Sequence, residues 1–172
     1  MSGSRFSLAT LIFALLAAAT PTGLEAAAIK AAFFPFEFID SGVGASVAPP
    51  AEEAARLALI GDLLKQRLTA PGIYEPIDLK GSAQAIAGSP ALRDCERCAN
   101  EIARRAGAEI AIVGWVQKVS NLILNINIRV SDAQSGQVLA AASADIRGNT
   151  DESWTRGVEW LVKNRLLAKL QP

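Results

Sequence analysis

The stretch IAIVGWVQKVSNLILNINIRVSD, residues 110–132, decides the fold of this 172-residue chain. Its first part is apolar almost throughout and predicts a buried strand over 108–119. Its second part, 122–132, alternates apolar and polar residues, which predicts a strand with one face in the core. The inward residues are Leu124, Ile126, Ile128 and Val130, and the outward residues are Asn125, Asn127, Arg129 and Ser131. Ser120 and Asn121 form a tight turn between the two strands.

The residues after this hairpin predict a third strand and a helix. AQSGQ, 133–137, is a second turn that leads into a strand over 138–147. NTDESW, 149–154, is typical of a helix start, with either Asn149 or Thr150 as the cap. The predicted buried stripe of this helix is Trp154, Val158, Leu161, Val162 and Leu166.

The first half of the chain alternates strand and helix patterns. AAFFPFEFID, 31–40, predicts a strand with Phe34, Phe36 and Phe38 on one face, at a sheet edge or bulged at Pro35. Apolar residues at three- and four-residue steps predict a helix over 51–69. A short strand within 73–79 and a flexible connector over 80–90 follow. Ser89 and Pro90 are expected to start a second helix that runs to about Arg105 and stops at Gly107.

The predicted order of elements is therefore β-α-β-α-β-β-β-α. Helical crossovers link the first strands and hairpins link the last three. This order predicts an α/β fold, a two-layer or three-layer sandwich around a mixed sheet.

The first 28 residues have the pattern of a cleaved secretory signal. Arg5 precedes an apolar run over 6–19, which is shorter than the roughly 20 residues that span a bilayer. Ala26 to Ala28 offer small residues for signal peptidase, and no cysteine lies there to carry a lipid. We expect a soluble periplasmic protein, not a lipoprotein, without stable membrane insertion after cleavage. Residues 29–172 are expected to form a single α/β domain.

Composition excludes several functional classes. The 17 basic and 17 acidic residues balance, which argues against a nucleic-acid partner. Histidine is absent from the sequence, which removes the Ser-His-Asp triad, the Cys-His dyad and the histidine ligands of zinc and haem. We expect no metal, no cofactor and no set of catalytic residues.

Cys95 and Cys98 are the only cysteines, and their spacing allows a structural disulfide, thiol–disulfide exchange or a metal clip. Export favours the disulfide, although so small a loop contributes only about 2 kcal/mol. A thioredoxin-like centre would follow a strand, whereas SPALRD precedes this pair. A helix start near Arg93 and Arg97 could still lower a thiol pKa. Zinc would need two carboxylate ligands, an unusual set. We interpret the pair as a structural disulfide.

Two polar surfaces are candidate partner-binding sites. RGNTDESWTRG, 147–157, gathers polar groups and one large aromatic at a strand-to-helix junction, where backbone N–H groups could hold an anion or a carboxylate. The candidate residues there are Arg147, Asn149, Asp151, Trp154 and Arg156. The simpler interpretation is a capped helix start with an inward tryptophan. The second surface is the strand face of Asn125, Asn127 and Arg129, which could equally be a bare solvated face. Trp115 and Trp160 would be anchors for a partner if they are exposed.

FFPFEFID, YEPID, IARRAGAEIAIVGWV and VSDAQSGQVL together resemble the amino-terminal domain of TolB and the related CsgG-like group of outer-membrane assembly proteins. Ala108 and Glu109 stand where that group has Ala-Asp, and Ser135 replaces the usual threonine of its hairpin. The resemblance implies a fold more than a role. More narrowly, residues 94–128 and 145–167 resemble an uncharacterised family of exported proteobacterial proteins of unknown function. That family brings no assigned activity, cofactor or catalytic residue.

Two hypotheses of function remain. The preferred one is a non-enzymatic periplasmic adaptor that binds an envelope or periplasmic protein. The alternative is a thiol–disulfide protein, with Cys95 as nucleophile and Cys98 as resolving thiol, or an accessory factor of a periplasmic oxidation system. Thiol–disulfide exchange is the only enzymatic activity that the residues support.

Overall fold

The structure is a computed structural model that describes residues 28–42 and 49–170. The predicted signal segment and most of the loop predicted after the first strand lie outside the described residues.

One mixed sheet organises the described chain. Its path is β3-β1-β4-β5-β6, and β2 pairs with β4 beyond the end of β1. β1, β2 and β3 run parallel to their neighbours, whereas β4, β5 and β6 form an antiparallel meander. The strands are β1 (Ile29–Phe33), β2 (Glu37–Asp40), β3 (Tyr74–Pro76), β4 (Ile110–Lys118), β5 (Ile123–Asp132) and β6 (Val138–Arg147). The predicted α/β fold with a mixed sheet is confirmed.

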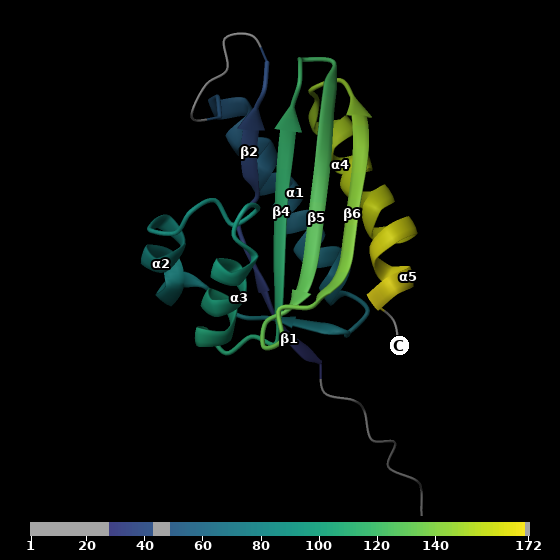
Figure 1. Ribbon diagram of the computed structural model, residues 1–172. Helices are drawn as coiled ribbons and strands as arrows, with labels where there is room; N and C mark the ends of the chain where they lie inside the picture. Colours follow the sequence, from purple (N-terminus) through teal and green to yellow (C-terminus); the bar gives the residue numbers. More distant parts are fainter. Residues whose placement is uncertain (1–27, 43–48, 171–172) are drawn as a thin grey trace, which may run out of the picture.

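Helices cover the two faces of the sheet unequally (Figure 1). On one face, α1 (Ala51–Thr69) and α4 (Asp151–Leu161) pack over the sheet, and a π-turn over 162–166 leads from α4 into α5 (Leu167–Leu170). On the other face, α2 (Ala83–Ala87) and α3 (Glu96–Arg105) lie on the β1 side. The apolar cluster beneath α3 contains no residue of β5 or β6. Apart from the end of β5 near Ser131, which contacts Asn100 of α3, those two strands therefore keep one face without a helix.

The predicted helix over 51–69 matches α1 to the residue, and its stripe of Leu57, Ile60, Leu64 and Leu68 is buried. The stripe predicted for α4 is buried as well, including Trp154 with 0% exposure. Thr150, rather than Asn149, caps α4: its hydroxyl accepts from the Ser153 N–H, and the Ser153 hydroxyl accepts from the Thr150 N–H.

The phenylalanine-rich segment is interrupted at residues 34–36, which agrees with the predicted irregularity at Pro35, but its side chains depart from the predicted single face. β1 lies inside the sheet between β3 and β4, and β2 pairs with β4 alone. Phe34 packs in the cluster beneath α3, whereas Phe36 packs in the cluster beneath α1. Because Pro35 has no N–H and fixes its own backbone, the chain leaves regular strand geometry there and the period-2 rule fails.

Two further boundaries differ from the sequence prediction. The expected flexible connector contains a 3-10 turn over 80–82 and the short helix α2. α3 begins at Glu96, not near Ser89, because residues 91–94 form a turn and Cys95 occupies the N-cap. The predicted helix stop is confirmed, since Gly107 has a φ of 86°, which favours glycine.

The Phe36 ring packs directly against the backbone of Gly114 in β4. A Cβ at this position would lie 2.4 Å from the Phe36 ring. We expect Gly114→Ala to lower the free energy of unfolding by about 1–3 kcal/mol, since the buried ring must shift. Gly81→Ala is the matched control, because a Cβ there meets nothing within 4 Å. Urea unfolding of both variants tests this, and equal stabilities would contradict the packing described.

Candidate binding surface

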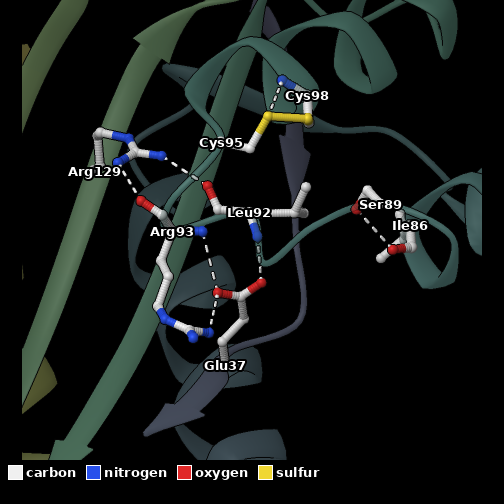
Figure 2. The surroundings of a disulfide bond; sticks show 8 residues. All are labelled: Glu37, Ile86, Ser89, Leu92, Arg93, Cys95, Cys98 and Arg129. Carbon is white, nitrogen blue, oxygen red and sulfur yellow. Dashed lines mark hydrogen bonds and ion pairs between the residues drawn. A yellow bond between two sulfur atoms is a disulfide. The ribbon is translucent and has the colours of Figure 1, made fainter.

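A disulfide joins Cys95 to Cys98 at the first turn of α3 (Figure 2). The Cys95 sulfur also accepts a hydrogen bond from the Cys98 N–H at 3.3 Å, so the same residue caps the helix. The predicted pairing is confirmed. Both cysteines are half-buried.

The segment before the disulfide is clamped to the sheet from two sides (Figure 2). The Glu37 carboxylate of β2 accepts from the backbone N–H groups of Leu92 and Arg93, at 2.6 and 3.1 Å, and from the Arg93 guanidinium at 3.1 Å. Arg129 of β5 donates to the carbonyl oxygens of Leu92 and Arg93, at 2.9 and 3.0 Å. Its guanidinium also lies 5.8 Å from the centre of the Trp115 ring.

This clamp corrects the predicted exposure of the β5 polar face. Arg129 is only 8% exposed and Ser131 is buried, because the segment before α3 and α3 itself cover that end of the strand. Asn100 of α3 accepts from the Ser131 hydroxyl at 2.6 Å. Of the outward residues, Asn125 and Asn127 remain on the open part of the face.

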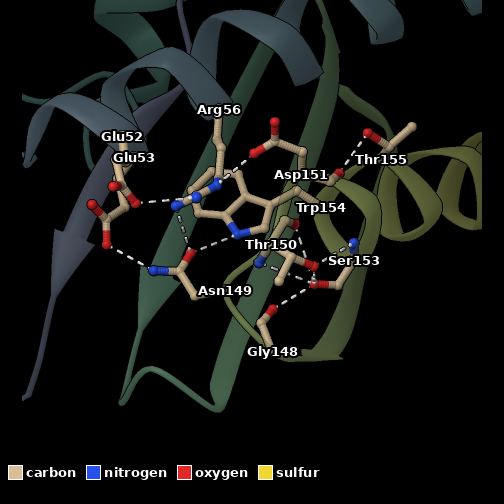
Figure 3. Close-up of polar contacts among 10 residues, drawn as sticks. All are labelled: Glu52, Glu53, Arg56, Gly148, Asn149, Thr150, Asp151, Ser153, Trp154 and Thr155. Carbon is tan, nitrogen blue, oxygen red and sulfur yellow. Dashed lines mark hydrogen bonds and ion pairs between the residues drawn. The ribbon is translucent and has the colours of Figure 1, made fainter.

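At the β6–α4 junction, a polar network ties the junction to α1 and β4 (Figure 3). Glu53 of α1 is 5% exposed, and its carboxylate accepts from Lys118 at 2.8 Å and from the Asn149 side chain at 2.7 Å. Asn149 in turn accepts from the Trp154 indole at 3.0 Å. Asp151 pairs with Arg56 at 2.8 Å. Asn149 and Trp154 therefore make their hydrogen bonds within the fold rather than to a partner.

Burial by itself would raise the pKa of Glu53, but hydrogen bonds from Lys118 and Asn149 outweigh it, so that the pKa is lowered. Both donors bind the same carboxylate oxygen, Oε1, so the network is a buried ion pair supported by one side-chain amide. It is a structural joint between three elements rather than a pair of carboxylates poised for acid–base chemistry.

The uncovered part of the sheet face carries a ladder of polar side chains. Asn125 donates to the Ser143 hydroxyl at 2.9 Å and to Asp145 at 2.7 Å, and Asn127 donates to Asn125. Trp115 stands half-buried beside Asn127, its partner in the β4–β5 register. The surface is flat, polar and internally hydrogen-bonded, with an aromatic at its border.

A groove of about 480 Å³ runs beside this ladder, between β6 and α4, and the sequence did not predict it. Residues 143–147 form one wall and Ser153, Arg156, Gly157 and Trp160 the other. Trp160 is 45% exposed, although the buried stripe of α4 lies on the opposite side. Arg147 and Arg156, both candidates from the sequence, are exposed and belong to this groove. In the sequence, Trp160 lies outside the apolar stripe of its helix, and this position was the feature that could have indicated an exposed aromatic side chain here.

Within residues 28–42 and 49–170, no three His, Cys, Asp or Glu side chains gather where they could hold a metal ion. No helix in this part of the chain has the length and apolar character needed to cross a membrane.

The fold and surface define a small mixed α/β domain whose sheet is fully covered on one face and half covered on the other. The chain belongs to the DUF3280 family, described as protein of unknown function (DUF2380), whose model matches residues 29–166. The resemblance to an uncharacterised family is thus confirmed. No curated protein matches the chain.

Several solved structures are similar at low identity. The LpoB C-terminal domain from Salmonella enterica is 16% identical over 73% of this chain and 86% of that chain, with a TM-score of 0.49. The PelC dodecamer from Paraburkholderia phytofirmans is 16% identical over 84% and 87%, with a TM-score of 0.47. Lipoprotein GNA1162 from Neisseria meningitidis is 15% identical over 73% and 83%, with a TM-score of 0.42. At these values the similarity assigns no role, and the resemblance to TolB stays a prediction.

The buried carboxylate gives a testable dependence of stability on pH. The pKa of Glu53 is lower in the folded chain than its ordinary value of 4.5, so its contribution to stability is present above that pH and is lost as the pH falls below it. At pH 7, Glu53→Gln leaves the Lys118 ammonium without its carboxylate and should cost about 3 kcal/mol. The variant should also lose less stability than the wild type between pH 5 and about 3. Urea unfolding across this pH range measures both effects.

Glu52→Gln is the control on the neighbouring position. Its side chain is 83% exposed, so we expect a change within about 0.5 kcal/mol. Equal changes in the free energy of unfolding for the two substitutions would contradict a stabilising role of the buried Glu53–Lys118 pair.

Proposed function

We propose that this protein is a non-enzymatic binding protein of the periplasm that docks another envelope protein on the open face of β4, β5 and β6. One observation carries the proposal: α1 and α4 pack over one face of the sheet, whereas α2 and α3 leave this part of the other face bare. The proposed location rests on the signal pattern, and the disulfide agrees with an oxidising compartment.

The bare face has the chemistry of a polar protein contact. Asn125 and Asn127 carry side-chain donors and acceptors in one plane, and Trp115 borders them. Arg147 and Arg156 stand at the rim, beside the groove. Tryptophan and arginine are enriched at protein interfaces. Asn149, Trp154 and Arg129 hold the fold together beneath the surface, and Asp151 is exposed but paired with Arg56.

Thiol–disulfide exchange remains the second candidate, because Cys95 caps a helix N-terminus and both cysteines are half-buried. Of the two arginines near the pair, Arg97 forms no ion pair within the described residues, whereas Arg93 is neutralised. Arg93 is committed to Glu37 at 3.1 Å and to Asp94 at 3.4 Å, so its charge is already balanced. A structural disulfide accounts for the geometry better.

The open face can be tested with a purified partner, identified first by cross-linking in the periplasm and mass spectrometry. Asn127→Arg places a long cation at the centre of the face and should weaken binding at least about tenfold, as expected when a central contact is blocked. Ala55→Arg on the exposed side of α1 is the control and should bind as the wild type does. Isothermal calorimetry gives both affinities, and equal binding by the two variants would argue against docking on this face.

Removal of the disulfide separates the two functions. Cys95→Ser should lower the free energy of unfolding by about 2 kcal/mol and leave partner affinity unchanged, because the closed loop is small and the hydrogen bonds of Glu37 and Arg129 still hold the segment before it. An exchanger would instead lose all activity. If Cys98→Ser traps a partner that only reductant releases, the adaptor proposal is wrong and Cys95 is a nucleophile.

A further inference from the structure

The groove lies along a strand edge whose backbone groups are free. β6 ends the sheet path, with β5 as its sole strand partner in the described chain. The Gly148 N–H donates to the Leu122 carbonyl oxygen at 3.0 Å, and Ile123 then faces Arg147. Hydrogen-bonded and non-hydrogen-bonded pairs alternate along an antiparallel ladder. Arg147, Asp145, Ser143 and Ala141 therefore turn their N–H and C=O groups away from β5.

No hydrogen bond within the described residues reaches those outward backbone groups of Ala141, Ser143, Asp145 and Arg147. Natural sheets protect such edges with short strands, lysine, proline or a covering segment. β6 is ten residues long, contains neither lysine nor proline, and carries no charge before Asp145. It is therefore built as an open pairing template.

Exposed apolar side chains follow the same edge. Val138 and Leu139 begin β6, Leu122 and Ile123 lie beside its far end, and Trp160 stands in the wall of the groove. Leu122 is 71% exposed. Of these five, Val138 and Leu139 belong to β6 itself, Leu122 and Ile123 lie at the start of the neighbouring β5, and Trp160 belongs to α4. The edge offers side-chain contacts as well as hydrogen bonds.

The charge around the groove is positive. Arg147 forms no ion pair within the described residues. The Arg165 guanidinium lies 5.3 Å from the centre of the Trp160 ring. Two acids lie nearby: Glu152 pairs with Arg156 at 3.3 Å, whereas Asp145 keeps its charge and accepts a hydrogen bond from the neutral Asn125 amide. A carboxylate on the incoming chain would find an unpaired arginine.

The helix layer decides between an extended segment and a second copy of the domain. α4 forms the outer wall of the groove, and Figure 1 shows α4 and α5 on the outer side of β6. One added strand needs only about 4.8 Å beside the edge. In a symmetric pairing of two β6 edges, each copy would bring its own α4 and α5 to the same place. A single added strand brings no second helix layer with it.

We propose that β6 receives an extended segment of the partner protein as an added strand, with an apolar side chain against Trp160 and an acidic side chain on Arg147. This proposal rests on the proposed binding function and names the chemistry of the partner. Main-chain hydrogen bonds to the outward groups of Ala141, Ser143 and Asp145 supply affinity, and the groove supplies selectivity.

The test uses the processed protein purified from the periplasm and a library of random heptapeptides displayed on phage. We expect enrichment of extended sequences that combine an apolar residue with Asp or Glu. The best synthetic peptide should shift the NMR signals of the Ala141, Ser143, Asp145 and Arg147 amides. In an added strand, every second backbone N–H of the peptide points toward β6. N-methylation of those residues should abolish binding, and N-methylation of the intervening residues should leave it unchanged.

Matched variants locate the contact. Ala141→Pro removes one outward N–H without breaking the β5 ladder and should reduce peptide affinity at least tenfold, whereas Ala141→Val should retain it. Trp160→Ala should also reduce affinity at least tenfold, and Lys163→Ala on the same helical segment should not. Circular dichroism checks that each variant folds. If Ala141→Pro does not fold, the comparison of Trp160→Ala with Lys163→Ala tests the proposal.

The failure of this proposal is distinguishable from failure of the proposed function. It is overturned if no sequence is enriched over a control protein, or if binding ignores Ala141→Pro and Trp160→Ala. A partner that is lost with Asn127→Arg but retained by both edge variants would leave the proposed function standing and remove the added strand.

Discussion

Burial of β4 on both faces is the constraint on which the rest of the fold depends. Ile110, Ile112 and Val116 point into the cluster beneath α1 and α4, whereas Ala111 and Val113 point into the cluster beneath α3. β1, β2 and β5 all pair with β4. Each layer therefore takes its position from one nearly continuous apolar strand, which is the usual pattern for a strand between two helical layers.

The unequal covering of the sheet follows from how the elements are distributed. The crossover from β2 to β3 supplies α1 to one face, and the crossover after β3 supplies α2 and α3 to the other. α4 then returns to the face of α1, where Gly157 allows close approach because a Cβ would meet Ile146 at 2.7 Å. Within the described chain, α3 and the segment before it reach only the Arg129–Ser131 end of β5, and no element is left to cover the rest of that face of β5 and β6. The bare surface is a consequence of the topology.

Local patterns predicted the parts of the structure that local physics controls. α1 and the β4–β5–β6 meander have continuous periodicity, and each was predicted closely. Phe34 and Phe36 were misassigned to one face because Pro35 breaks the period, and Arg129 was predicted exposed because alternation gives a face but not what covers it. The groove beside Trp160 was not predicted because it exists only through the strand order that puts β6 at the edge.

The hydrogen bonds of Glu53 also determine how force on the end of β6 is distributed. Asn149 follows β6 by two residues and is tied to Glu53, which also holds Lys118 at the end of β4. A pull on the end of β6 is therefore transmitted through one carboxylate to the first turn of α1 and to the β4–β5 hairpin. Tension along the outer strand is shared with the centre of the sheet, so that this end of β6 resists peeling away alone.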